Sequence, residues 1–290
     1  MSELLRISLS AGYAGRPDVL KHVELDLQQG EILALVGQSG SGKSTIAMAV
    51  LGLLATRGGI AQGQVMFEGS DLLLLSERRL REIRGRRIAL VPQSPIASLN
   101  PALKIGSQFK EAWKAHRPSD SGRWRGEAIE ALDLACLPGA PTILDSYPHE
   151  LSVGLAQRVL IAMAILHRPS LVIADEPTSA LDVITQHEIL RLFADLNRLL
   201  GTSILYISHD LLSVASLSHR VAILHGGEVV ETGLTPRIFA SPGHSYTARL
   251  IASLPRQPSL SPPDPPDPRS VATLMNRSRL ADSSKVHTEK

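Results

Sequence analysis

The clearest chemistry in the chain lies in nine consecutive residues, which are Gly37, Gln38, Ser39, Gly40, Ser41, Gly42, Lys43, Ser44 and Thr45. A glycine, four residues and then Gly-Lys-Ser form the P-loop pattern, in which backbone N–H groups converge on the phosphates of a nucleotide. Lys43 is expected to reach the β- and γ-phosphates, and the Ser44 hydroxyl to ligate Mg²⁺. The run follows an apolar stretch and opens a helical pattern, so we predict a bound nucleotide with Mg²⁺.

Two adjacent carboxylates supply the second half of a phosphoryl-transfer site. Residues 171–174 form an apolar strand that is followed directly by Asp175 and Glu176. Parallel sheets bind ligands at the carboxyl ends of their strands, so this end should face the same crevice as the P-loop. Asp175 is suited to hold the Mg²⁺ hydration shell, and Glu176 is suited to polarise an attacking water. Taken alone, the pair could also be a solvated turn.

The elements that must position these residues alternate between strands and helices. Residues 183–200 form a predicted helix, and short alternating strands are expected at 3–9 and 21–27. From about 94 to 166 the pattern is helical, so a helical insertion is expected to interrupt an α/β core. Uniformly apolar stretches predict a parallel sheet covered on both faces, with strands at 32–36, 88–91, 171–174, 203–207 and 221–224.

Length and composition limit the kinds of protein that the chain can form. Its 290 residues suffice for one large α/β domain or two smaller ones. Cys136 is the only cysteine, which excludes a disulfide framework and favours a reducing compartment. The net charge of +2 gives no reason to expect nucleic acid as a partner. No apolar run reaches the roughly 18–20 residues that span a bilayer, so we expect a cytosolic chain that meets a membrane through a partner.

Two segments have a biased composition. Residues 77–87 (ERRLREIRGRR) mix two glutamates with six arginines, and we interpret them as a solvated helix face rather than a binding patch. Residues 255–290 are proline-rich at first and then polar and aperiodic. We predict a disordered tail with polyproline character there, which could be a dispensable extension or a docking motif.

A third motif distinguishes among P-loop proteins. The stretch Leu151–Arg158 reads LSVGLAQR and lies at the end of the helical insertion, before the acidic strand. Ser152 is a good N-cap for the apolar helix predicted at 159–166, and a helix start offers free N–H groups to a phosphate. The stretch resembles the signature sequence of ABC ATPases, usually LSGGQ followed by Gln-Arg. As a bare sequence it could be merely a capped helix.

The resemblance extends to four further landmarks in the expected order. Gln93, after the strand at 88–91, matches the glutamine that in the family contacts Mg²⁺ and senses the transmembrane subunit. Residues 179–182 match the loop that crosses to the partner ATPase, and His209 matches the histidine that contacts the γ-phosphate. Tyr13, which we expect in a loop, stands where the family places an aromatic that stacks on adenine, although it could simply pack.

What the resemblance implies is an α/β fold with a P-loop (RecA-like) parallel-sheet core, an N-terminal antiparallel β subdomain and an inserted α-helical subdomain. The nucleotide-binding domain would span residues 1–254, with the insertion at about 94–160. ATP and Mg²⁺ are the implied cofactors. The implied catalytic residues are Lys43, Gln93, Glu176 and His209. The implied Mg²⁺ ligands are Ser44, Gln93 and Asp175. Nucleotide contacts would further come from the loop Gly37–Thr45, Tyr13, Ser152, Gly154 and Asp182.

Local segments narrow the resemblance to importers of peptides and nickel. These segments are Ser98–Pro101, Tyr147–Ser152, Arg158–Ala164, Gly227–Gly233 and Ser241–Thr247. The group implies an ATP-hydrolysing subunit that lies peripherally on the cytoplasmic face of the inner membrane. Its implied partners are two transmembrane permease subunits, a second ATPase bound head to tail, and an extracytoplasmic solute-binding protein. An exporter ATPase and a soluble ABC ATPase remain alternatives, and the sequence does not name the cargo.

Two departures from the family pattern carry consequences. Val153 replaces the first signature glycine, and Leu155 stands at the usual glutamine position. A β-branched side chain near a γ-phosphate contact should slow the site that this signature completes. We therefore hypothesise a non-identical partner ATPase and two unequal ATP sites. The tail also lacks the cysteines that many peptide-importing members carry, which weakens the peptide assignment without establishing nickel.

Overall fold

A six-stranded sheet carries the predicted site residues, and its strand order is β10-β9-β3-β8-β7-β6. The computed structural model describes residues 2–117 and 122–254, and the predicted tail at 255–290 lies outside them. The strands are β3 (Ile32–Val36), β6 (Ile88–Val91), β7 (Leu171–Asp175), β8 (Ser203–Ser208), β9 (Arg220–His225) and β10 (Glu228–Leu234). The five apolar strands pair in parallel, as predicted. Only β10 pairs antiparallel, on β9, and its partly exposed residues gave no strand signal.

The N-terminal part of the chain forms a four-stranded antiparallel sheet of order β2-β1-β4-β5. Its strands are β1 (Glu3–Tyr13), β2 (Arg16–Gln28), β4 (Gly59–Phe67) and β5 (Ser70–Asp71). The antiparallel subdomain is confirmed, but β1 and β2 are longer than predicted, and β4 and β5 were not anticipated. The expectation that Tyr13 lies in a loop is wrong, because it is the last residue of β1 and pairs with Gly59 and Arg16.

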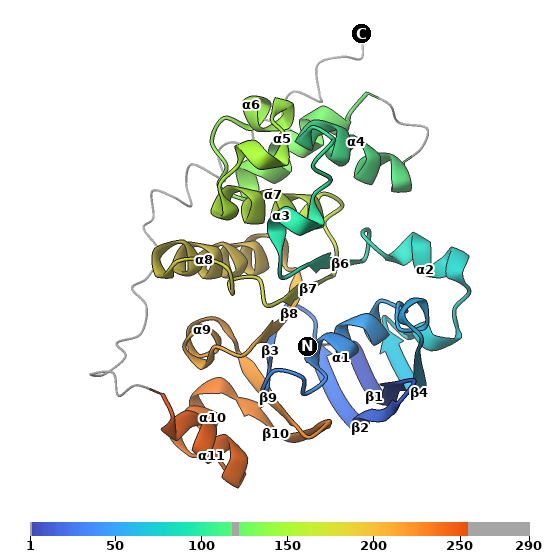
Figure 1. The fold of residues 1–290 in the computed structure, drawn as a ribbon, viewed down its shortest axis with the longest axis vertical. Helices are drawn as coiled ribbons and strands as arrows, with labels where there is room; N and C mark the ends of the chain where they lie inside the picture. Colours follow the sequence, from blue (N-terminus) through green and yellow to red (C-terminus); the bar gives the residue numbers. More distant parts are fainter. Residues whose placement is uncertain (1, 118–121, 255–290) are drawn as a thin grey trace. The chain divides into compact units, whose positions relative to one another are not determined.

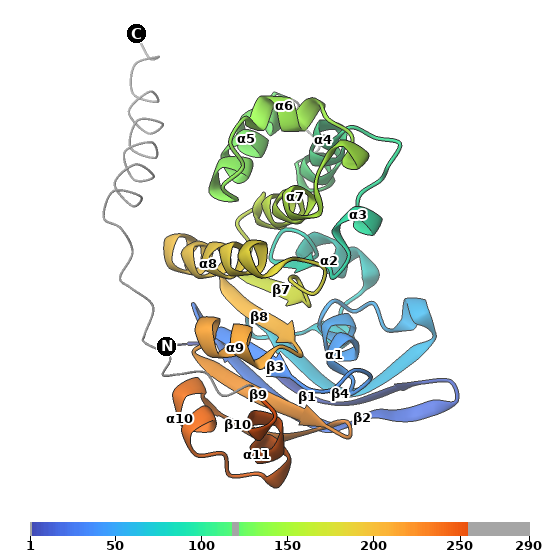
Figure 2. The same cartoon turned by 60° about the vertical axis from the view of Figure 1, so that its left-hand side comes forward.

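The two faces of β3 pack into two separate cores. Leu33 and Leu35 face the antiparallel sheet and α1 (Lys43–Val50), whereas Ala34 and Val36 face α8 (Val183–Leu200) and α9 (Leu211–Leu217). Figure 2 shows α8 and α9 on one side of the strands and β1 and β2 on the other. Two further helices, α10 (Thr235–Ala240) and α11 (Ser245–Ala252), follow β10. Burial on both faces is the reason that these strands carry no polar alternation.

Between β6 and β7 the described chain is helical, in the segment where the insertion is predicted (Figure 1). The helices are α3 (Pro95–Ser98), α4 (Ile105–His116), α5 (Trp124–Leu134), α6 (Ala140–Asp145) and α7 (Val153–Ile165). Phe109 and Trp113 of α4 are fully buried in the core they share with α7. Short 3₁₀ turns lie at Ala55–Arg57, Leu72–Leu74 and Pro148–Glu150. None of the helices in the described part of the chain has the length and apolar composition that spanning a bilayer requires.

The arginine-rich segment forms α2 (Glu77–Ile83), which is largely solvated as predicted. Arg79 and Arg81 are exposed and pair with glutamates of the same helix, over three and four residues. Arg84 departs from the prediction, because its guanidinium donates to the carbonyls of Leu51 and Gly52 after α1. The run therefore offers a solvated face with one residue turned inward, not a free cationic patch.

Candidate functional site

The phosphate loop connects β3 to α1 in a conformation that requires glycine. Gly42 is the N-cap of α1 with φ 106°, and a Cβ there would lie 2.5 Å from Cδ2 of Leu20. Lys43 is 5% exposed, and its ammonium donates to the carbonyls of Gly37 at 2.8 Å and Gln38 at 3.1 Å. The loop therefore wraps around the side chain of Lys43, which is the backbone arrangement that a phosphate-binding loop requires.

The acidic strand end lies beside this loop. β7 ends at Asp175, and Glu176 follows in a left-handed conformation with φ 48°, its N–H donating to the carbonyl of Ile207 on the neighbouring strand. Burial raises the pKa of the Asp175 carboxyl, which a hydrogen bond from Ser44 partly opposes. One carboxylate oxygen of Asp175 is buried and has no hydrogen-bond partner among the described residues. A buried orphaned oxygen beside the Ser44 hydroxyl fits a Mg²⁺ ion, which takes oxygen ligands and retains several waters.

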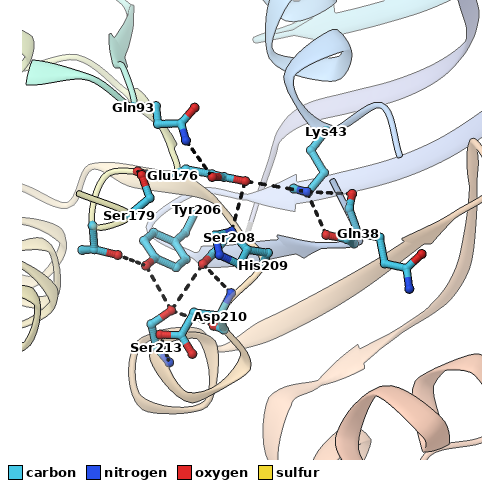
Figure 3. A network of polar contacts seen from close by, with 12 residues as sticks. Gln38, Lys43, Gln93, Glu176, Ser179, Tyr206, Ser208, His209, Asp210 and Ser213 are labelled. Atoms are coloured by element: carbon cyan, nitrogen blue, oxygen red, sulfur yellow. Dashed lines mark hydrogen bonds and ion pairs between the residues drawn. The ribbon is translucent and has the colours of Figure 1, made fainter. Parts of the chain in front are cut away.

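Glu176 is the point at which three loops meet (Figure 3). Its two carboxylate oxygens contact Nε2 of Gln93 at 3.0 Å and Nδ1 of His209 at 3.3 Å. The ammonium of Lys43 lies 3.8 Å from the same carboxylate. Burial lowers the pKa of Lys43, which the charges of Glu176 and Asp175 oppose. The predicted catalytic residues, from four separate segments, therefore converge at one carboxylate.

A hollow of about 320 Å³ opens between these loops. Its walls are Val36, Gly37, Gln38, Ser39, Glu176, His209 and Leu250. Leu250 belongs to α11 and was not predicted, because an apolar residue at helical spacing gives no sign of which surface it covers. The helix is fixed by Glu231 on β10, whose carboxylate accepts from the backbone N–H groups of Gly243 and His244. Tyr246 stacks on His225, which anchors the same helix.

The signature segment is a capped helix start, as predicted from Ser152. The Ser152 hydroxyl accepts from the N–H of Leu155 at 3.3 Å, and α7 runs from residue 153 rather than from 159. Val153 is 41% exposed, so its side chain is not required for packing. Gly154 is required, since a Cβ there would lie 2.8 Å from the methyl carbon of Thr185.

Several predicted nucleotide contacts do not line the hollow, and four of them lie on other parts of the chain than the catalytic loops. Neither Ser152 nor Gly154 lines it, and neither does Tyr13. Tyr13 is half-buried, and its ring packs closely over the backbone of Gly59. Asp182 caps α8, accepting from the N–H groups of Ile184 and Thr185. In this chain alone, these residues do not form a site together with Glu176.

The geometry suits hydrolysis of a nucleoside triphosphate. An anion-binding loop with a buried lysine lies against a carboxylate that can orient water, and the site carries no cysteine nucleophile. Within the described ranges no three His, Cys, Asp or Glu side chains gather into a metal cluster. A site for Mg²⁺ does not need one, because phosphates and water supply most of its ligands.

Comparison with known proteins agrees with this chemistry. Residues 20–179 match the family described as ABC transporter. The oligopeptide transport ATP-binding protein OppD of Bacillus subtilis is 43% identical over 244 residues, which are 84% of this chain and 68% of that protein. The dipeptide transport ATP-binding protein DppD of Escherichia coli is 41% identical over 233 residues, which are 80% and 71% of the two chains.

Solved structures give the same result. The ATP-binding cassette MJ0796, a dimer in a post-hydrolysis state bound to ADP and Pi, superimposes with a TM-score of 0.69 and 28% identity. The superposition covers 81% of this chain and 99% of that one. The predicted importer-group resemblance is confirmed by the relatives, and the predicted fold class by the cassette. The chain therefore belongs to the ABC transporter family, as an ATP-hydrolysing member.

Proposed function

We propose that this chain binds MgATP at the hollow and hydrolyses it to energise the import of peptides across the cytoplasmic membrane. The observation that carries the proposal is the Glu176 carboxylate, held at 3.0 Å from Gln93 and 3.3 Å from His209, with Lys43 at 3.8 Å. The functions of the two relatives, oligopeptide and dipeptide transport, support peptides as the cargo.

Hydrolysis follows from the placement of these groups. Glu176 orients a water molecule, whose oxygen forms a bond to the γ-phosphorus while the bond to the β–γ bridging oxygen breaks. The water proton passes to the carboxylate or to the departing phosphate, and ADP and inorganic phosphate leave. Lys43 and His209 lie where they can neutralise charge on the phosphoryl oxygens. Ser44, Asp175 and Gln93 would hold Mg²⁺, which would supply further charge neutralisation for the phosphates.

The partners and location follow from the importer assignment. We place the chain peripherally on the cytoplasmic face of the membrane, with two permease subunits, a second ATPase and, indirectly, a solute-binding protein outside. Nucleotide contacts that lie apart from the hollow, among them Ser152, Gly154 and Asp182, would be used across the ATPase pair. The dimeric cassette bound to ADP and Pi supports such a pair.

Replacement of Glu176 by Gln tests the hydrolytic assignment. We expect Glu176→Gln to lower the ATPase kcat by about 100-fold or more, because the amide cannot accept the water proton. MgATP binding, measured with a fluorescent nucleotide, should survive. The matched control is Glu111→Gln on the exposed face of α4, which should retain wild-type turnover. Unchanged turnover in Glu176→Gln would remove this carboxylate from its role.

The cargo is tested on the membrane complex. We expect the chain to co-purify with permease subunits, and the associated binding protein to gain thermal stability with peptides, since a ligand of the folded state raises its apparent stability. Stabilisation by Ni²⁺ and not by peptides would replace peptide with nickel as the cargo. Failure to find any permease would favour a soluble ABC ATPase, and vectorial efflux would favour an exporter.

The inequality of the two ATP sites is tested at Val153. Its exposed side chain makes Val153→Gly structurally tolerable. We expect this variant to raise the turnover of the assembled transporter, because it removes a β-branched group from the phosphate-facing helix start. The same turnover in both complexes would count against unequal sites and remove the reason for a non-identical partner.

A further inference from the structure

Tyr206 places a hydroxyl group in the interior of the molecule. Packing alone does not explain why a hydroxyl is there. The residue lies on β8 and is 0% exposed, with its ring edge-to-face against Phe193. Its hydroxyl donates to Oγ of Ser213 at 3.1 Å and lies 3.4 Å from Oγ1 of Thr178 (Figure 3). A buried hydroxyl costs stability unless it is hydrogen-bonded, so a phenylalanine would pack here at no such cost.

The two partners of this hydroxyl belong to the two catalytic loops. Thr178 follows Glu176 by two residues, and Ser213 lies in the first turn of α9, which begins two residues after His209. Tyr206 itself lies on β8, which ends at Ser208, one residue before His209. Its side chain therefore connects the loop that carries Glu176 to the loop that carries His209.

A second link, through Asp210, joins the loop that carries His209 to α8, the helix that follows the Glu176 loop along the chain. Its carboxylate caps α9 by accepting from the N–H groups of Leu212 and Ser213. The same carboxylate accepts from Nε2 of Gln186 on α8 at 2.6 Å. The N–H of Asp210 in turn donates to Oγ of Ser208 at 3.0 Å. His209 therefore lies between Ser208 and Asp210, and the side chains of both neighbours are hydrogen-bonded.

Both links end in the segment that follows Glu176 along the chain, one at Thr178 and one at Gln186. This segment also contains the capped start of α8 at Asp182. A shift of either loop would stretch both links, and the 3.3 Å contact between His209 and Glu176 would change with them. Small displacements matter at such a site, since a misplacement of about 1 Å can cost about 100-fold in rate.

We propose that Tyr206 and Gln186 are positioning residues, which fix His209 relative to Glu176 through Ser213 and Asp210. Neither side chain lines the hollow, so neither meets the nucleotide there. The proposal rests on the ATPase function proposed above and adds two residues to it. If the proposal is correct, loss of either link lowers the turnover number more than it weakens nucleotide binding.

The chain offers a matched control for the tyrosine. Tyr246 is also buried, but no hydrogen-bond partner of its hydroxyl is found in the described part of the chain. Tyr246→Phe therefore removes the same atom as Tyr206→Phe without breaking a bond between catalytic loops. Gln186→Met removes the bond to Asp210 while it keeps the length and much of the shape of the side chain.

Steady-state ATPase kinetics of the full-length chain test the proposal. We expect Tyr206→Phe and Gln186→Met each to lower kcat by about three- to tenfold, with KM for ATP within about twofold of wild type. Tyr246→Phe should match wild type in both constants. In a His209→Ala background, neither positioning variant should lower kcat further, because the residue being positioned is absent.

Backbone hydrogen exchange gives a readout that does not depend on turnover. We expect faster exchange at residues 207–213 in Tyr206→Phe and Gln186→Met, and no change there in Tyr246→Phe. Wild-type kcat in both variants would overturn the proposal, and so would a raised KM at constant kcat or a further loss in the His209→Ala background. A wild-type chain without ATPase activity would instead overturn the proposed function, while the exchange data would still decide whether the links hold the loop.

Discussion

Glu176 combines a catalytic position with an unfavourable backbone. A glutamate at φ 48° lies in a region that costs about 1–3 kcal/mol for residues other than glycine. The bond from its N–H to Ile207 and the bonds that its carbonyl accepts from Ser179 hold it there. The sequence predicts the residue type through the apolar strand that precedes it, but not this conformation. No local pattern separates a strained carboxylate from an ordinary strand end.

A pair of glycines in the phosphate loop allows a residue-scale prediction. Gly40 and Gly42 both have positive φ, but a Cβ meets nothing within 4 Å at Gly40, whereas at Gly42 it meets the Leu20 side chain at 2.5 Å. We expect Gly40→Ala to cost about 1 kcal/mol of stability from backbone strain alone. Gly42→Ala should in addition displace the loop and weaken MgATP binding by more than tenfold. Equal nucleotide affinities in a fluorescence titration would show that the Leu20 contact does not shape the loop.

Long apolar elements are the part of the fold that the sequence predicts well. The strands predicted at 88–91 and 171–174 are uniformly apolar, the helix predicted at 183–200 is periodic, and the structure reproduces all three, with β7 one residue longer than predicted. β4 was missed because two glycines and two glutamines interrupt its pattern, and the pairing with β1 creates it as a strand. The links of Tyr206 and Gln186 were missed for a similar reason. They arise from tertiary contacts between helices and strands, which neither periodicity nor local motif encodes.

At the scale of elements, one carboxylate fixes the start of α11. Glu231 accepts two backbone N–H groups at the start of this helix. Burial alone would raise the pKa of Glu231, but the hydrogen bonds from the N–H groups of Gly243 and His244 help to lower it. We expect Glu231→Ala to release α11, with faster hydrogen exchange at residues 243–252 and a changed environment at Leu250. Wild-type exchange would mean that the stack of Tyr246 on His225 suffices to hold the helix.

At the scale of the whole described domain, Arg220 joins the two sheets. Its guanidinium on β9 binds both oxygens of Asp26 on β2, at 3.1 Å each, and also contacts Glu31. These hydrogen bonds hold the pKa of Asp26 below its ordinary value of 3.8, against the opposing effect of burial. The pair therefore bridges the antiparallel sheet and the nucleotide-binding sheet.

The pH dependence of unfolding follows from this pair. Because the folded pKa of Asp26 is lower than the unfolded one, its contribution to stability is complete above the unfolded value of 3.8 and is lost as the pH falls through the folded value. Urea unfolding at a series of pH values should show Asp26→Asn to be less stable at pH 7 and to lose less stability on acidification. If the free energy of unfolding falls equally with pH in wild type and in Asp26→Asn, Asp26 does not contribute to the loss of stability in acid.

The order of strands in the central sheet has a consequence for synthesis of the chain. The phosphate loop leaves β3, yet β3 is paired with β8 and β9, so that Ile32 lies opposite Ile204 and Leu33 opposite Arg220. Contacts of such sequence separation form late, because most of the chain between them must first be ordered. A ribosome-bound chain that has exposed the whole glycine-rich loop would still lack both flanking strands. Nascent chains whose β9, which ends at His225, is still inside the exit tunnel should therefore not bind ATP, and nucleotide binding should appear only when β9 has emerged.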